Sequence, residues 1–198
     1  MKILAALATL AVVAAPVSFA RADDISLGDP SYNGSGCPAD TASATLSPDG
    51  KSLSILFGAY QAEAGGATGK TFDRKACNIA IPVHVPQGLS ISVLKIDYRG
   101  YNNVPVGGNT NFHVEYFFAG ARGPIFDKTF KGPLDDEYTI PNSLTAQSMI
   151  WSPCGADVNL RTNTSIRVTT KNNAQALATV DSEDVNAAIV YQLQWKSC

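Results

Sequence analysis

The sequence predicts an all-β protein, an antiparallel β-sandwich of the jelly-roll kind that is stabilised by disulfide bonds. Apolar and polar residues alternate with a period of two in many short segments, as they do in half-buried strands. Turn residues separate those segments, and the 198 residues include 16 glycines and 11 prolines. No segment combines a sustained helical period with an N-terminal cap and a terminating glycine. At this length such a pattern indicates a sandwich or a closed barrel, of which we favour the sandwich.

The first 22 residues have the features of a secretory signal peptide. A single positive charge, Lys2, precedes an apolar run over residues 3–15, and small residues beyond the run suit cleavage before Asp23. The apolar run is shorter than the roughly 20 residues that a membrane-spanning helix needs. We therefore expect a secreted protein, or a periplasmic or cell-surface one in a bacterium, with residues 23–198 in one domain.

The charge of the exported chain argues against two classes of partner. Removing Lys2 and Arg21 from the 15 basic residues leaves 13 against 17 acidic residues, a formal charge of −4. A weakly acidic chain lacks the attraction that nucleic acids and anionic membranes exert on basic proteins. We expect neither nucleic-acid binding nor membrane insertion, and the sequence leaves the oligomeric state open.

The four cysteines, Cys37, Cys77, Cys154 and Cys198, predict two disulfide bonds, because an even number in an exported chain is typical of a disulfide framework. Three pairings are possible. We favour the pairing of nearest neighbours, Cys37 with Cys77 and Cys154 with Cys198. Each bond would then close a loop of about 40 residues and add on the order of 4 kcal/mol of stability. A disulfide also argues against Cys154 as a nucleophile or a zinc ligand.

The alternation predicts individual strands and the residues that they bury. Residues 41–60 form a predicted hairpin with its turn at Ser47–Gly50. Between residues 89 and 98 the apolar set changes parity near Val93, which predicts a β-bulge, and Pro82 inside its run predicts an edge strand or a bulge. Residues 174–188 fit a helical turn or a loop equally well. The predicted inward residues are Leu53, Ile55, Phe57, Ile79, Ile81, Val83, Val85, Leu89, Ile91, Val93, Leu94, Ile96, Tyr98, Phe112, Val114, Tyr116, Phe118, Ala187, Ile189, Tyr191, Leu193 and Trp195.

The segment DYRGYNN, residues 97–103, is the most suggestive binding motif. It combines aromatic rings with planar hydrogen-bonding groups, a mixture that suits the recognition of sugars. The predicted ligand-binding residues are Asp97, Tyr98, Arg99, Tyr101 and Asn102. A purely structural interpretation is a buried Asp97–Arg99 ion pair with the two tyrosines packed over a strand corner.

Other chemistries have weaker support. If their strands were neighbours, His84, His113 and Glu115 would make a metal site of two histidines and one carboxylate, although two ordinary surface histidines are the simpler interpretation. We predict no metal and no cofactor. A serine-hydrolase elbow and a phosphate-binding loop are absent from the sequence. Carboxylates for glycoside hydrolysis exist, but no spacing marks any two as a pair. They are Asp97, Glu115, Asp127, Asp135, Asp136 and Glu137.

Short motifs in a fixed order resemble a known family. They are GSGCP (34–38), SPDG (47–50), CNIAIPVHVPQG (77–88), DYRGY (97–101), YFFAG (116–120), GP (132–133), WSPCG (151–155) and QWKSC (194–198). Together they resemble domain of unknown function 4360, a family of small secreted proteins of fungi and bacteria. The resemblance covers residues 25–198. It implies export and four ordered cysteines, and it implies no activity.

These observations favour a secreted, non-catalytic binding or surface-interaction protein whose ligand is a carbohydrate or a cell-wall component. One alternative is an extracellular hydrolase that acts on polysaccharide with paired carboxylates. Another is a structural coat or matrix protein. Asn33 and Asn163 begin NGS and NTS sequons, which would be glycosylation sites in a eukaryotic host.

Overall fold

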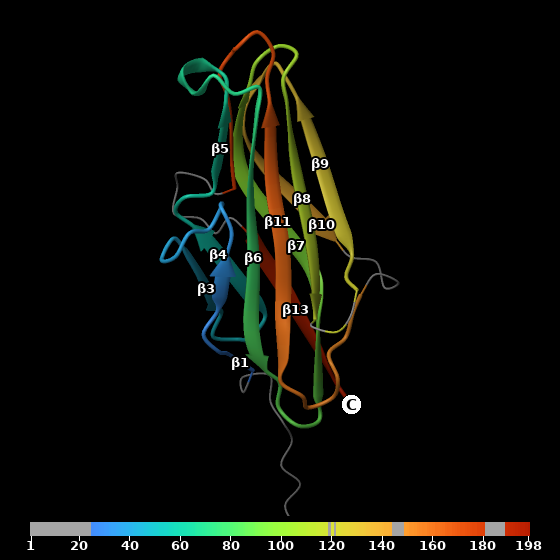
Figure 1. Ribbon diagram of the computed structural model, residues 1–198. Helices are drawn as coiled ribbons and strands as arrows, with labels where there is room; N and C mark the ends of the chain where they lie inside the picture. Colours follow the sequence, from blue (N-terminus) through green and yellow to red (C-terminus); the bar gives the residue numbers. More distant parts are fainter. Residues whose placement is uncertain (1–24, 119, 121, 144–148, 181–188) are drawn as a thin grey trace, which may run out of the picture.

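The computed structural model is a β-sandwich of two antiparallel sheets (Figure 1). It describes residues 25–118, 120, 122–143, 149–180 and 189–198. The predicted signal peptide, residues 1–22, lies outside the described residues. Within the described part of the chain, the helical structure is a single 3-10 turn, η2 (Gly66–Thr68). No helix there has the length and apolar character needed to cross a membrane.

The first sheet, which we call sheet A, forms the front layer in Figure 1. Its strand order is β1-β6-β11-β8-β9, and β2 also pairs with β6. The longest ladder joins β6 to β11 along nearly their whole lengths. The bounds are β1 (Ser26–Leu27), β2 (Ser31–Asn33), β6 (Phe72–His84), β8 (Asn109–Phe118), β9 (Ile125–Lys131) and β11 (Val158–Thr169).

The second sheet, sheet B, lies behind it with the order β3-β4-β13-β7-β12-β5. The long strand β7 organises this sheet, because β13 and β12 pair with one of its edges and β10 pairs with the other. The bounds are β3 (Ala42–Leu46), β4 (Ser52–Phe57), β5 (Gln61–Ala64), β7 (Leu89–Val104), β10 (Leu134–Ser143), β12 (Ala176–Thr179) and β13 (Ile189–Ser197).

Most of the residues that the alternation predicts to point inward lie in the core between the sheets, which also contains residues outside that prediction, among them Leu160, Ile166 and Val168 of β11. Alternate side chains enter the core along strands such as β4 and β8, because successive side chains point to opposite faces of a sheet. Trp195 is only partly buried, at the edge of the core. Ala187 lies outside the described residues. The prediction is confirmed for Leu53, Ile55, Phe57, Ile79, Ile81, Val83, Val85, Leu89, Ile91, Val93, Ile96, Tyr98, Phe112, Val114, Tyr116, Phe118, Ile189, Tyr191 and Leu193.

The predicted bulge is present in β7, one residue beyond Val93. Lys95 pairs with Gln192 and Val93 pairs with Leu193, so Leu94 has no partner on β13. The prediction that Leu94 is buried is wrong, since 41% of its surface is exposed. The extra residue shifts the alternation by one position. The apolar residues before and after the bulge therefore face the same core, although their parity in the sequence is opposite.

Two further local predictions have clear outcomes. The hairpin forms as β3 and β4, closed by a hydrogen bond from the Gly50 amide to the Ser47 carbonyl at 2.9 Å. Pro82 lies on the outer edge of β6 between the residues that pair with β2 and those that pair with β1. Its carbonyl accepts a hydrogen bond from the Gly28 amide at 2.8 Å. The prediction of an edge strand or a bulge at Pro82 is therefore wrong, since β6 pairs with β11 without a break and with the short strands β1 and β2 on its other side.

Both disulfides follow the favoured pairing. Cys37 is bonded to Cys77 with 5.4 Å between their Cα atoms, and Cys154 is bonded to Cys198 with 5.9 Å. The first bond is buried in the core, whereas the second is exposed. Because Cys154 is covalently bonded, it has no thiol to act as a nucleophile or a zinc ligand.

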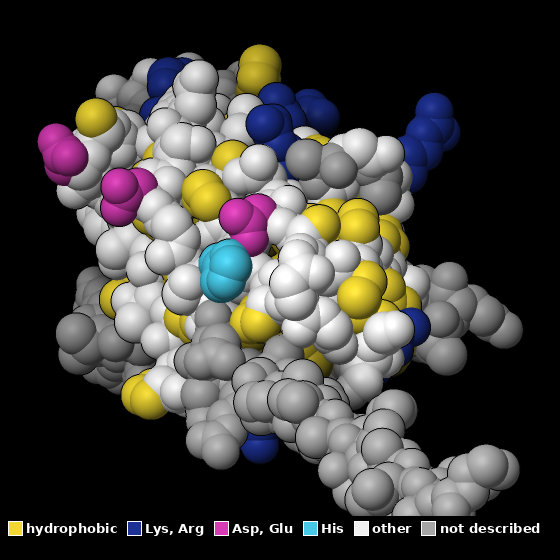
Figure 2. All heavy atoms as spheres, turned by 90° about the horizontal axis from the view of Figure 1, so that it is seen from below, with side chains coloured by type: hydrophobic (Ala, Val, Ile, Leu, Met, Phe, Trp, Pro, Cys, Tyr) yellow, Lys and Arg dark blue, Asp and Glu magenta, His cyan; other side chains and the backbone are white. Residues whose placement is uncertain are grey.

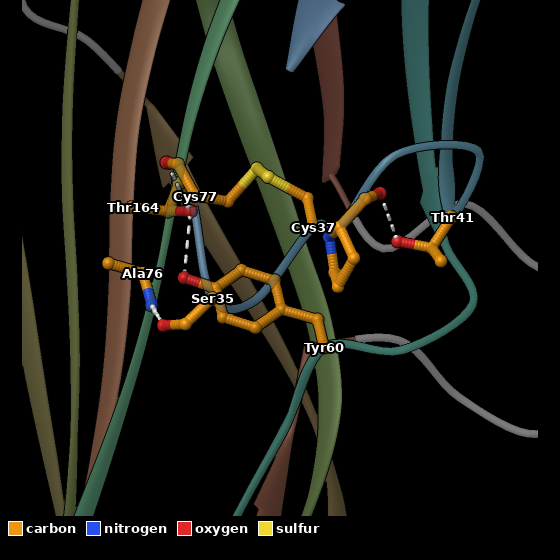
Figure 3. Close-up of a disulfide and its surroundings, with 8 residues drawn as sticks. Ser35, Cys37, Thr41, Tyr60, Ala76, Cys77 and Thr164 are labelled. Carbon is orange, nitrogen blue, oxygen red and sulfur yellow. Dashed lines mark hydrogen bonds between the residues drawn. A yellow bond between two sulfur atoms is a disulfide. The ribbon is translucent and has the colours of Figure 1, made fainter. Parts of the chain in front are cut away.

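Polar groups inside the core also join the two sheets. In Figure 3 the Tyr60 side chain reaches Thr164 of β11 beside the Cys37–Cys77 bond, with 2.9 Å between the two hydroxyl oxygens. The Thr164 hydroxyl also donates to the Cys77 carbonyl at 3.2 Å. A second link of this kind joins Tyr191 of sheet B to Thr162 at 2.5 Å. These contacts satisfy hydroxyl groups that would otherwise be costly to bury.

Candidate functional site

The predicted binding residues alternate between the two faces of β7. Tyr98 and Asn102 point into the core, where their exposed fractions are 0% and 1%. Asp97, Arg99 and Tyr101 point outward and are half-buried. The motif therefore contributes two side chains to the core and three to the outer face of sheet B.

The two inward side chains hold the sheets together. The Tyr98 ring stacks on Phe126 with 5.2 Å between ring centroids and meets Phe112 edge-on at the same distance. The amide oxygen of Asn102 accepts a hydrogen bond from the Thr110 hydroxyl of sheet A at 2.8 Å. Neither side chain is accessible to a ligand in this structure.

The outward carboxylate of Asp97 is paired with Lys95, not with Arg99. The Lys95 ammonium lies 2.9 Å from one Asp97 oxygen, and the Gln192 amide donates to the other at 3.5 Å. The buried Asp97–Arg99 ion pair is therefore not the arrangement that forms. Arg99 keeps a buried Nε–H that has no hydrogen-bond partner.

Among the described residues, sheet B has a gap between β13 and β12 beside Arg99, Gly100 and Tyr101. On this edge of β7, β13 pairs as far as Tyr98 and β12 begins at Asn102. Within the gap the Tyr101 amide donates to the Thr179 hydroxyl at 3.1 Å. The described strands β12 and β13 thus meet the same edge of β7 on either side of the gap.

A pocket of about 620 Å³ lies at this gap. Its volume is within the range of small-molecule sites. Buried aromatic and aliphatic side chains contribute an apolar part, and Gln61 and Glu137 contribute exposed polar groups. The described lining residues are Phe57, Gly58, Ala59, Tyr60, Gln61, Tyr101, Glu137, Leu177, Thr179 and Val180.

Tyr101 is held in place at this pocket by its neighbours on β10. Its hydroxyl donates a hydrogen bond to the carboxylate of Asp135. Glu137 lies directly opposite Tyr101 in the ladder between β7 and β10. A positioned aromatic ring beside a carboxylate is a combination that binds the apolar face and the hydroxyl groups of a sugar.

The pocket does not assemble the pair of carboxylates that glycoside hydrolysis needs. Among its described lining residues, Glu137 alone carries a carboxylate. Asp97 is bound to Lys95, and Asp135 accepts the Tyr101 hydroxyl. An acid and a base facing one substrate would require a second carboxyl group in the pocket.

The two histidines do not share a site. Each makes its own pair with an aspartate, His84 with Asp157 at 2.7 Å and His113 with Asp127 at 2.8 Å. His113 of β8 and Ala76 of β6 lie level with each other, because both pair with Ser165 of β11. His84 is eight residues from Ala76 on β6, so the two histidines are about 26 Å apart along the strand direction. The described residues contain no cluster of metal-ligating side chains. The hypothesis of a site made by His84, His113 and Glu115 is therefore wrong.

Sequence reasoning missed most of the pocket. Gln61, Glu137, Leu177 and Thr179 come from three strands whose neighbours cannot be deduced from local pattern. The sequence marks Glu137 only as one of six carboxylates. The local signal for this part of the fold is Gly100, whose added Cβ would lie 2.2 Å from the Thr179 carbonyl oxygen and 2.4 Å from the Tyr138 hydroxyl. A glycine inside a strand marks such a close approach.

The fold and its two covalent links define a disulfide-stabilised β-sandwich, and the pocket beside Tyr101 lies at sheet B. The chain belongs to the family described as domain of unknown function (DUF4360), whose model matches residues 23–198. It is 33% identical over 178 residues to an uncharacterized secreted protein of Arthroderma benhamiae. That match covers 89% of this chain and 73% of the fungal protein.

Proposed function

We propose that the protein is a secreted, non-catalytic binding module whose ligand is a carbohydrate of the cell wall or extracellular matrix. The pocket beside Tyr101 carries this proposal, because it combines buried apolar side chains with exposed polar groups. The two disulfides and the secreted relative support export.

A single carboxylate in the described lining favours binding over hydrolysis. Glu137 accepts hydrogen bonds from sugar hydroxyls in this proposal, and the Tyr101 ring packs against the apolar face of the sugar. Gln61 supplies a further amide at the exposed side of the pocket. Binding of a sugar in this way requires no proton transfer.

The test is a glycan array followed by calorimetry with the oligosaccharide that binds best. Replacing Glu137 with Gln removes one charged acceptor, and the dissociation constant is expected to rise about tenfold. Asp136→Asn is the matched control, because Asp136 precedes Glu137 on β10 but does not line the pocket. The control should bind like the wild type.

Two results would overturn the proposal. One is a wild-type protein that binds none of a broad panel of cell-wall polysaccharides and their fragments. The other is equal binding by the wild type and by Glu137→Gln and Tyr101→Ala, because the ligand would then bind elsewhere. Concentration-dependent self-assembly without any glycan would favour a structural matrix protein instead.

A further inference from the structure

The outer face of sheet A carries arginines that have no acidic partner. Arg74 of β6 and Arg167 of β11 lie directly opposite each other in the ladder, and both are exposed. Like charges in directly opposite positions destabilise a sheet. Neither guanidinium takes part in a salt bridge with any described residue. The fold therefore holds two positive charges together without internal compensation.

A third arginine extends this charge along the same face. Arg161 is exposed on β11, six positions before Arg167 and on the same side of the strand, so about 20 Å separates their Cα atoms. The Arg167 guanidinium lies 5.6 Å from the centre of the exposed Phe72 ring. Stacking of this kind orients the planar group and leaves its N–H edge open.

Polar amides fill the face between the arginines. Asn33, Asn78 and Asn163 lie level with one another on β2, β6 and β11, so their backbones are about 4.8 Å apart from strand to strand. Two acidic groups, Glu115 and Asp127, also lie on this face. Glu115 accepts a weak hydrogen bond from the Asn163 amide at 3.5 Å, and Asp127 pairs with His113.

The lower end of the molecule shows both basic and acidic side chains on its surface (Figure 2). Figure 2 shows several Lys and Arg side chains along the upper side of the view, which is the side of the front layer in Figure 1. The outer face of sheet B carries the acidic groups Asp97, Asp135 and Glu137 beside the basic Lys95 and Arg99.

We propose that the outer face of sheet A is a second binding surface, for a linear anionic polysaccharide that carries uronate or sulfate groups. The forked guanidinium groups of Arg74, Arg161 and Arg167 match carboxylate and sulfate geometry. The intervening asparagines suit hydroxyl groups, which alternate with the charges along such a polymer. The charge complementarity is local, since the chain as a whole is acidic. This surface is separate from the pocket beside Tyr101, on the opposite sheet.

The probe is polygalacturonate, with uncharged pullulan as the matched polymer. Binding is measured by affinity electrophoresis and by calorimetry at low and at physiological salt. The double variant Arg74→Gln/Arg167→Gln is expected to weaken polygalacturonate binding at least about tenfold at low salt. It should fold at least as well as the wild type, since it relieves a like-charge contact.

Two control variants separate this site from bulk charge and from the pocket. Lys51→Gln/Lys196→Gln makes the same change of charge at exposed positions away from sheet A and should leave polygalacturonate binding within about twofold. Glu137→Gln should also leave it unchanged. Arg74→Lys/Arg167→Lys keeps the charge but loses the forked shape of the guanidinium group. Its affinity for polygalacturonate should lie between those of the wild type and of the Gln variant.

Several outcomes would overturn the proposal. The first is a wild-type protein that binds neither polygalacturonate nor heparin. The second is an equal loss of polygalacturonate binding in Arg74→Gln/Arg167→Gln and in Lys51→Gln/Lys196→Gln. The third is binding of pullulan that is as tight as binding of polygalacturonate. Tighter binding of duplex DNA or of phosphatidylserine vesicles would assign the face to another class of partner. None of these results bears on the pocket, which Glu137→Gln tests separately.

Discussion

The hydroxyl of Tyr138 donates a hydrogen bond to the backbone carbonyl of Thr179, with 2.9 Å between the two oxygens. This bond passes over Gly100 and connects β10 to the end of β12 across β7. It is possible only because Gly100 has no side chain. The contact fixes one side of the gap in which the pocket lies.

Replacing Gly100 with Ala is expected to destabilise the fold by about 2 kcal/mol or more, because the new methyl group would overlap two oxygen atoms. Gly58→Ala is the control, since its added Cβ has only an ordinary contact, 3.7 Å from the Thr41 carbonyl. Chemical denaturation measures both. Equal stability of the two variants would show that β10 and β12 move apart without cost.

The Tyr60–Thr164 contact should show strong coupling in a double-mutant cycle. Thr164→Val leaves the buried Tyr60 hydroxyl without its partner and is expected to cost about 1–3 kcal/mol. Adding Tyr60→Phe removes that unsatisfied group, so the double variant should be more stable than the sum of the two single effects. Additive free energies of unfolding would contradict this prediction.

The two disulfides should differ in their accessibility to reductant. Dithiothreitol without denaturant is expected to reduce the exposed Cys154–Cys198 bond first and to spare Cys37–Cys77, which is buried. Alkylation and peptide mass spectrometry give the order. Replacing Cys154 and Cys198 together with Ser should lower stability by about 4 kcal/mol in the chain-entropy model. Reduction of the buried bond first would mean that this part of the core opens readily.

Alkaline pH should unfold the protein through its buried tyrosines. Burial raises the pKa of Tyr60, Tyr98, Tyr138 and Tyr191 above the ordinary value of 10.0. Their stabilising contribution is complete below pH 10. It is lost above pH 10, where the unfolded chain releases phenol protons that the folded chain keeps. The free energy of unfolding should fall by about 1.4 kcal/mol per pH unit for each such tyrosine.

Absorbance at 295 nm, which follows phenolate formation, tests this prediction together with circular dichroism. Ionisation of the buried tyrosines should coincide with the loss of the β-sheet signal. Titration of all seven tyrosines near pH 10 in a protein that stays folded would contradict it.

Much of the fold was predictable because burial follows local parity. Leu53 and Ile55 alternate with Ser52 and Ser54, and such a strand has only one face that can be buried. The bulge at Leu94 was predicted to within one residue, since a change of parity requires an extra residue. The favoured disulfide pairing was also correct.

The rest depended on contacts distant in sequence. Residues 176–179 form β12, although the pattern of residues 174–188 indicated a helical turn or a loop. Two alanines give that strand no clear alternation, and its pairing with β5 and β7 determines its conformation. Of the motif at residues 97–103, Tyr101 lines the pocket. Which side chains face outward there depends on the bulge, and which strands meet at the pocket depends on the topology.

The position of β13 has a consequence for how the protein reaches its native state. The hairpin β3–β4 joins β7 only through β13, which comes from the other end of the sequence. A chain that has been synthesised only as far as residue 188 therefore lacks the strand at the middle of sheet B. Until β13 is inserted, β4 has no partner on one of its edges. Contacts between segments so distant in sequence form slowly. Sheet B is thus completed only when residues 189–197 are available, an order of folding compatible with transport of the chain across a membrane before it folds.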